Sequence, residues 1–305
     1  ALAMGLEMAT ARIGTGLAIA TSAPIAVALK DVSKPVLVGL ILLCIGMIAF
    51  FLYTIEDKKL DEEIKAETAG SENPAEETFK VKDIFSILKN RGWWYIAILC
   101  VLFYSAVFPF LKYATDLMVN KFGLNEKVAG LIPMLLPFGT IILTPFFGNI
   151  YDRKGKGATI MIIGALLLIF VHALFSVPAL NQVPVAIFLM IVLGIGFSLV
   201  PSAMWPSVPK IIPEKQLGTA YALIFWVQNW GLMGVPALIG WVLDKYCITG
   251  TKLIEGVEIS SYNYTIPMII FTMFGILALV FGFLLKAEDK RKGYGLELPN
   301  IKKQE

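Results

Sequence analysis

Charged residues, histidine and cysteine are all scarce in this chain. Asp, Glu, Lys and Arg make up 16% of the 305 residues, against about 25% in a typical soluble domain. A single histidine and three cysteines without CxxC or Cys/His spacing provide neither a zinc site nor a disulfide framework. The net charge of +3, without a Lys/Arg stripe and interleaved aromatics, points to no nucleic-acid partner.

Sequence patterns typical of enzymes are missing as well. One histidine and no clustered acids leave no metal-ligand set and no Ser–His pair, so we expect no enzyme and no cofactor. The chain has no Walker A pattern, which argues against ATP as the energy source. The first residues carry no basic stretch and no cleavage site, so we expect no signal peptide.

Apolar residues, in contrast, are abundant. They make up 57% of the chain, against about 45–50% in a soluble domain. A membrane helix needs about 20 mostly apolar residues. We therefore predict an all-α, polytopic bundle of membrane helices. Its eight predicted spans cover residues 3–29, 35–55, 93–117, 128–150, 158–178, 184–208, 217–242 and 264–286.

Lys and Arg are divided unevenly between the loops on the two sides of this bundle. Eighteen lie in the loops 56–92, 152–157 and 209–216 and in the tail from residue 286, whereas six lie in the loops 30–34, 119–127 and 244–263. Cytoplasmic loops carry the excess of positive charge in membrane proteins. We therefore predict that both ends of the chain lie in the cytoplasm, and we expect the membrane to be a bacterial inner membrane.

The long loop 56–92 separates two predicted spans from the six that follow it. It is rich in Glu, Lys, Ala and Ser, a composition that predicts disorder in its first part. Its second part, 81–91, has apolar residues at helical spacing and predicts a short amphipathic helix on the membrane surface. These apolar residues are Val81, Ile84, Phe85 and Leu88.

The turn between the fourth and fifth predicted spans carries the most specific motif of the chain. It reads Gly148-Asn-Ile-Tyr-Asp152-Arg153-Lys154-Gly155-Lys156-Gly157. This segment resembles the loop signature G-x-x-x-D-R-x-G-R-[RK] of the major facilitator superfamily, except at its last residue, where a basic side chain is usual. Glycines permit a tight turn, and Asp152 can pair with Arg153 or with a neighbouring helix N-terminus. A plain basic cytoplasmic turn is the alternative interpretation.

The resemblance implies a larger fold with two six-span halves joined by a long cytoplasmic loop. In this chain the motif falls between the second and third of the six spans that follow loop 56–92, where the second copy of the signature would lie. We therefore expect a fragment that lacks the first four spans. Residues 1–55 would be the last two spans of the first half, 56–92 the central loop, 93–286 the second half, and 287–305 a cytoplasmic tail.

Other segments are similar to the lysosomal dipeptide-transporter branch of that superfamily and its bacterial relatives. They are Met8-Ala-Thr-Ala-Arg12-Ile-Gly14, Ala106-Val-Phe-Pro-Phe110, Trp205-Pro206, Pro213-Glu-Lys-Gln-Leu-Gly-Thr-Ala-Tyr221 and Gln228-Asn229-Trp-Gly231. The resemblance implies a secondary transporter that works by alternating access, with short peptides as candidate substrates.

Arg12 is the sharpest candidate for a functional residue. It lies nine residues into its predicted span, which is roughly 14 Å deep at about 1.5 Å per residue. A charge at that depth costs at least about 2.5 kcal/mol and normally faces a partner or a water-filled path. Its planar guanidinium suits a substrate carboxylate. A structural ion pair with Glu7, or with an acid in the absent spans, is the alternative.

Four further side chains are candidate substrate contacts. Gln228 and Asn229 lie in mid-span, where an amide needs a partner, so they serve either helix packing or a ligand. Trp226 would line the same cavity or pack. Lys112 lies four residues before Asp116 and forms either a surface ion pair with it or a contact at the outer mouth. The single histidine, His172, either packs or carries a proton.

Two function classes compete with transport. A membrane-embedded enzyme lacks a catalytic set in this sequence, and a transport-inactive scaffold or receptor-like protein would leave Arg12 without use. We therefore expect a transporter of a small organic solute in the lipid bilayer, with a proton as the candidate coupling ion. Its oligomeric state is left open by the sequence.

Overall fold

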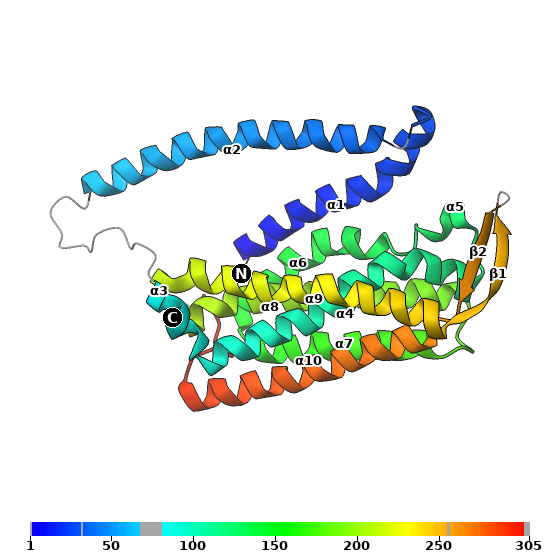
Figure 1. Cartoon of the computed structure of the whole chain (residues 1–305). Helices are drawn as coiled ribbons and strands as arrows, with labels where there is room; N and C mark the ends of the chain where they lie inside the picture. Colours follow the sequence, from blue (N-terminus) through cyan, green and yellow to red (C-terminus); the bar gives the residue numbers. More distant parts are fainter. Residues whose placement is uncertain (1, 32, 68–80, 255–256, 302–305) are drawn as a thin grey trace. The chain divides into compact units, whose positions relative to one another are not determined.

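A computed structural model of the chain describes residues 2–31, 33–67, 81–254 and 257–301. The chain divides into two units, of which the first comprises Ala1–Ile13 and Lys80–Glu305 and the second Gly14–Phe79. The first helix, α1 (Leu2–Ala28), begins in the first unit and ends in the second, which also contains α2 (Lys34–Glu67). The remaining elements of the first unit are α3 (Val81–Leu88), α4 (Arg91–Phe122), α5 (Glu126–Ala129), α6 (Leu135–Lys154), α7 (Gly157–Ser176), α8 (Val183–Ile211), η1 (Glu214–Gln216), α9 (Leu217–Tyr246), β1 (Ile248–Ile254), β2 (Val257–Tyr262) and α10 (Thr265–Lys292) (Figure 1).

Helices dominate, and the prediction of a helical membrane bundle is confirmed. Six of the helices that the structure describes are long and apolar enough to cross a membrane, namely α2, α4, α7, α8, α9 and α10. The predicted spans 3–29 and 128–150 are helical as well, as α1 and α6, but they are not among these six. The second of them begins later than predicted because residues 130–134 form turns before α6.

The predicted disorder in the first part of loop 56–92 is wrong for residues 56–67. These residues continue α2 as a regular helix, because Glu, Lys, Ala and Leu are strong helix formers. An ion pair of 2.7 Å between Lys59 and Glu56, one helical turn apart, adds to this. Residues 68–80 lie outside the described part of the chain. The helix predicted over 81–91 is present as α3, and its Ile87 is fully buried.

The helices of the first unit pack side by side around shared apolar faces (Figure 1). α4 packs against α9 and α10, α7 against α8 and α10, and α6 against α8. Glycine allows the closest of these approaches. A Cβ atom at Gly164 of α7 would lie 3.1 Å from the carbonyl oxygen of Gly196 on α8 and would collide with Val200. Small residues at crossings are how membrane helices gain van der Waals contact without a hydrophobic driving force.

The predicted loop 244–263 contains a small β-hairpin that the sequence reading left unassigned. Strands β1 and β2 pair antiparallel with Ile248 opposite Tyr262 and Ile254 opposite Val257. Thr, Ile, Val and Tyr favour extended backbone in this segment. The hairpin is held to the bundle, because the hydroxyl of Tyr262 donates to Asp244 over 3.0 Å at the end of α9.

Candidate functional site

A cavity of 560 Å³ lies among four helices of the first unit. Its walls come from the start of α1, the middle of α4, the last turns of α8 and the first half of α9. The lining residues are Met4, Glu7, Met8, Ala11, Arg12, Tyr104, Phe108, Trp205, Tyr221, Phe225, Gln228 and Leu232. Most are apolar or aromatic, and the charged groups among them are one carboxylate and one guanidinium. Mostly apolar walls with a few polar groups are typical of small-molecule sites.

The guanidinium of Arg12 lies over two aromatic rings. Its central carbon is 4.9 Å from the ring centroid of Phe197 and 5.1 Å from that of Phe108, and these two rings meet edge to face. Such cation–π contacts hold the charge without using its N–H donors. Within the described residues, Arg12 makes no hydrogen bond and no ion pair, so the alternative of a pair with Glu7 is not formed. The half-buried Arg12 therefore presents its donors to the cavity.

Hydrogen bonds fix the aromatic wall of the cavity. The indole Nε1–H of Trp205 donates to the hydroxyl of Tyr104 over 3.1 Å, which ties α8 to α4. The hydroxyl of Tyr221 donates to the carbonyl of Trp205 over 2.9 Å, which ties α9 to α8. The Trp205 ring also stacks on Phe225 at a centroid distance of 4.8 Å. The wall is thus preformed, and ligand binding would not have to order it.

The structure brings Gln228 into the cavity but not its neighbours Asn229 and Trp226. Gln228 is buried, and its carbonyl oxygen accepts from the Cys100 thiol over 3.3 Å. The Asn229 amide donates to the Phe225 carbonyl of its own helix, and the Trp226 side chain is 61% exposed. Successive helical residues point about 100° apart, so adjacent positions cannot all face one cavity.

Lys112 lies elsewhere. It is exposed and does not line the cavity. Within the described part of the chain it forms no ion pair with Asp116, whose carboxylate instead accepts from the hydroxyl of Tyr264 over 2.5 Å. The interhelical bond between α4 and the start of α10 therefore takes the place of the predicted pair along one helix.

His172 is fully buried and away from the cavity. Its ring lies between Phe110, at a centroid distance of 5.0 Å, and Phe271, at 5.3 Å. Neither ring nitrogen has a hydrogen-bond partner among the described residues. This position favours the packing interpretation of His172 over the proton-carrier interpretation.

Sequence reasoning missed most of the aromatic lining. On α9 the lining residues Tyr221, Phe225, Gln228 and Leu232 are spaced by four, three and four positions, which is one face of a helix. On α4 the lining residues Tyr104 and Phe108 are four positions apart and therefore also lie on one helix face. Residues three or four positions apart lie on the same face of a helix. Counting in such steps in both directions from Gln228 would have identified the lining face of α9.

The motif forms a tight turn between α6 and α7. Two residues separate the helices, Gly155 with a φ of +69° and Lys156 with a φ of +68°. Gly148 and Asp152 are buried in the last turns of α6. Arg153 is exposed, and its Nε donates to the Asn149 side chain over 3.1 Å. Arg153 is therefore not the described partner of Asp152.

Asp152 joins three parts of the chain. Its Oδ2 accepts from the backbone N–H of Leu2, in the first turn of α1, over 2.8 Å. Its Oδ1 accepts from the Asn300 amide over 2.7 Å, and its carbonyl accepts from the backbone N–H groups of Asn300 and Ile301 over 3.0 Å each. Burial raises the pKa of this carboxyl, but the surrounding hydrogen bonds and charges, including the hydrogen bonds from Asn300 and Leu2, together lower it below its usual value. Asp152 therefore contacts both the first turn of α1 and the segment after α10.

The segment after α10 covers the motif turn. The N–H of Lys156 donates to the carbonyl of Glu297 over 3.0 Å, and that of Gly157 donates to Leu296 over 2.9 Å. The Glu297 carboxylate accepts from the N–H and hydroxyl of Thr159 at the start of α7 over 2.9 and 2.7 Å. Lys210 of α8 donates to the carbonyl of Leu298 over 2.8 Å. The predicted tail is therefore a packed element as far as Ile301.

Comparison with known proteins places these features in a family. The family model described as Major Facilitator Superfamily matches residues 1–236. The Lysosomal dipeptide transporter MFSD1 of Homo sapiens is 32% identical over 152 residues, covering 50% of this chain and 32% of that protein. The Gallus gallus protein of the same name is 27% identical over 248 residues, covering 80% of this chain and 55% of its own length.

Two further likenesses widen this comparison. The Inner membrane transport protein YdiN of Escherichia coli (strain K12) is 26% identical over 190 residues, covering 60% of this chain and 41% of that protein. A mutant of the peptide transporter POT, solved in complex with alafosfalin, has the same fold with a TM-score of 0.54 at 16% identity, over 68% of this chain and 40% of its own. The chain spans between about a third and about half the length of the curated relatives it matches.

Docking of the tail on Gly155 is open to a direct test. A Cβ atom there would lie 2.5 Å from the Glu297 carbonyl oxygen, so Gly155→Ala should displace the tail. We expect faster hydrogen exchange at the Asn300 and Ile301 amides and a lower melting temperature. Gly293→Ala is the matched control, because Gly293 also has a positive φ, +71°, but nothing lies within 4 Å of its Cβ position. Equal hydrogen exchange in the two variants would show that backbone strain of about 1–2 kcal/mol, and not the loss of tail docking, causes the effect of Gly155→Ala.

Proposed function

This chain belongs to the major facilitator superfamily, and from that premise we propose that its cavity is the central binding site of a secondary transporter for a small organic solute. The supporting observation is the cavity of 560 Å³ in which the Arg12 donors, without a partner among the described residues, lie beside preformed aromatic walls. Its relatives and fold neighbours are transporters rather than enzymes. Alternating access would expose the cavity to each side of the membrane in turn.

The charged groups of the cavity favour a zwitterion such as a dipeptide. Arg12 would bind the carboxylate with two parallel hydrogen bonds, and Glu7 would bind the ammonium group. The two residues are five positions apart on α1, which corresponds to about 7.5 Å of helix rise. Two extended residues span at most about 7 Å, so the separation suits the ends of a dipeptide. The human relative is named a dipeptide transporter, which agrees with this substrate class.

The remaining expectations belong to the same proposal. Residues 1–55 would be the last two spans of a first half, and 93–286 a second half, because the chain covers only part of its relatives' length. Glu7 is the carboxylate that lines the cavity, and we propose it as the carrier if a proton is the coupling ion. The protein is a multi-pass membrane protein, and we propose a bacterial inner membrane with both ends of the chain in the cytoplasm.

Replacement of Arg12 tests the substrate site. Arg12→Lys retains the charge but loses the planar pair of donors, and Arg12→Gln loses both. In the full-length transporter, both variants should bind a dipeptide more weakly by about 1–3 kcal/mol, which is roughly 5- to 150-fold. Dipeptide uptake measured over a range of concentrations provides the affinity.

Lys215→Gln is the control for charge, because Lys215 is exposed at η1 and does not line the cavity. Its affinity should equal that of the parent protein. If folded Arg12→Lys and Arg12→Gln proteins also keep the parent affinity, Arg12 is not a substrate ligand, and the site would centre on Gln228.

Replacement of Asp152 tests the motif. Asp152→Asn keeps the shape but removes the charge that faces the first turn of α1, and it leaves one of its two oxygen acceptors. We expect the full-length protein to fold and to transport more slowly, because one access state loses a stabilising contact. Asp57→Asn removes an exposed charge in the second half of α2 and should transport normally. Unchanged turnover in Asp152→Asn would show that the motif only anchors the turn.

The orientation follows from the uneven distribution of Lys and Arg. Single cysteines at Ser71 and Thr249, introduced after replacement of Cys44, Cys100 and Cys247, would be labelled in intact cells with a reagent that does not cross membranes. Thr249→Cys should react from outside, and Ser71→Cys should react only after the cells are opened. Labelling of Ser71→Cys in intact cells would contradict the predicted orientation and would place this loop outside the cell.

A further inference from the structure

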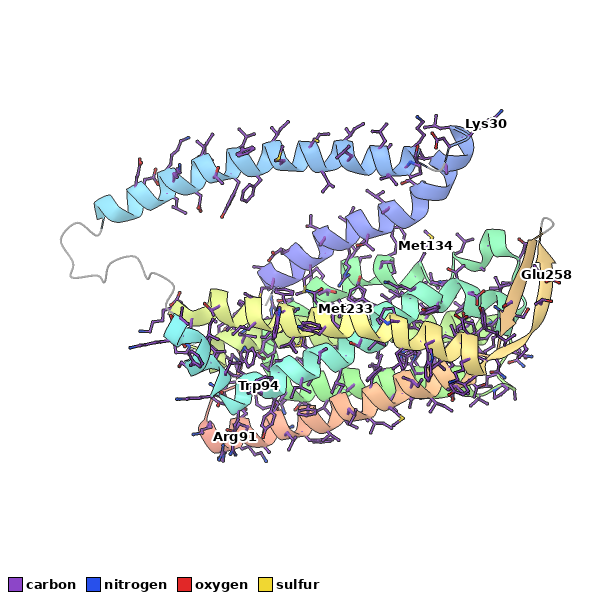
Figure 2. The ribbon with its side chains drawn as sticks, in the orientation of Figure 1. Lys30, Arg91, Trp94, Met134, Met233 and Glu258 are labelled. Carbon is purple, nitrogen blue, oxygen red and sulfur yellow. The ribbon has the colours of Figure 1, made fainter. Side chains whose placement is uncertain are left out.

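A second hollow, of 460 Å³, lies where the start of α4 meets the end of α10. It shares no lining residue with the cavity of Arg12. Its lining residues are Ser86, Lys89, Asn90, Arg91, Glu288, Arg291, Lys292 and Tyr294. Figure 2 labels Arg91 at the first position of α4 and Trp94 three residues further along.

The charges around this hollow are not balanced. Four of the lining side chains are cationic and one, Glu288, is anionic. Both Glu288 oxygens are taken by Arg291, whose Nε and terminal nitrogen donate over 2.9 and 2.6 Å, and the Glu288 side chain is only 7% exposed. Lys89, Arg91 and Lys292 are exposed, and none of them has a hydrogen bond or ion pair within the described residues. The lining of the hollow thus carries an excess of three positive charges, because Glu288 balances only one of its four cations.

The frame that holds these cations is rigid. The Asn90 side chain caps α4, accepting from the N–H groups of Gly92 and Trp93 over 2.9 and 3.3 Å. Its amide donates to the Ile211 carbonyl at the end of α8 over 3.3 Å. The hydroxyl of Tyr294, from the docked tail, donates to the same Asn90 side chain over 3.3 Å. The start of α4 and the end of α10 are therefore joined through one residue.

We propose that this hollow binds a phosphate group, carried by the headgroup of an anionic phospholipid or by a soluble phosphate. An anion here would offset the mutual repulsion of Lys89, Arg91 and Lys292. The Arg91 guanidinium supplies the planar pair of donors that matches phosphate oxygens. Two lysines, as compact flexible charges, can reach the remaining oxygens.

The surroundings of the hollow favour a lipid as the source of the phosphate. Trp94 is 38% exposed, and its Nε1–H, the polar group of the ring, donates to the Leu88 carbonyl over 2.8 Å. Val81 and Phe85 on α3 are each 62% exposed. Exposed aromatics beside cations are typical of the membrane interface, and clustered Lys and Arg at that level recognise anionic headgroups. The inference does not depend on the transport function.

Thermal melting of the purified full-length protein in neutral detergent tests this site. The probes are dioleoyl phosphatidic acid, dioleoyl phosphatidylcholine and inorganic phosphate. We expect phosphatidic acid to raise the melting temperature at concentrations at which phosphatidylcholine does not. The variant Lys89→Gln/Lys292→Gln should need roughly 10- to 30-fold more phosphatidic acid for the same rise, at about 1 kcal/mol for each lost charge.

Lys154→Gln/Lys290→Gln is the matched control, because it removes two exposed lysines that do not line the hollow. It should respond like the parent, and Lys89→Arg/Lys292→Arg should retain the response. A rise with inorganic phosphate that is lost in Lys89→Gln/Lys292→Gln would identify the soluble form as the ligand and still support the site. An equal response to both lipids, or equal losses in the test and control variants, would overturn the proposal.

Discussion

Every polar group that lies in hydrocarbon must find its partner within the protein, and this constraint underlies the whole structure. It makes the spanning segments helical, since a helix pairs its own N–H and C=O groups. It also decides where polar side chains can lie. Gln228 is buried and pairs with Cys100 across two helices, and Tyr264 pairs with Asp116. Arg12 differs from these residues, because its charge rests on two phenyl rings and its donors face a cavity without partners among the described residues. The same constraint therefore points to a polar ligand.

The end of the first unit that carries the motif turn is organised around polar contacts between segments far apart in sequence. Asp152 connects the first turn of α1 with the tail, and Glu297 of that tail binds the start of α7. Tyr294 extends the same tail to the cap of α4. The motif turn and the phosphate hollow therefore share contacts with the tail. A change in the position of the tail would affect both of them.

The packing inside the bundle depends on small residues in the same way. Gly164 and Gly196 bring the backbones of α7 and α8 together, and Gly231 lies against Ser105 and Val101 of α4. In a membrane the lipid chains are as apolar as leucine, so close van der Waals contact has to replace the hydrophobic effect as the source of helix association. The rigid scaffold that results holds the aromatic wall of the cavity in place.

The sequence by itself determined the helical membrane class and the family motif, and it singled out Arg12 as a candidate, because long apolar runs, a specific turn and a charge within a span are local signals. It misjudged residues 56–67, where helix propensity outweighed a disorder-like composition. Only the tertiary structure decided that Gln228 faces the cavity while Asn229 and Trp226 do not, that Tyr104, Phe108, Tyr221 and Phe225 form its wall, and that the tail covers Asp152. These choices depend on how helices rotate and cross, which is set by contacts between segments far apart in the chain and leaves no local pattern to detect.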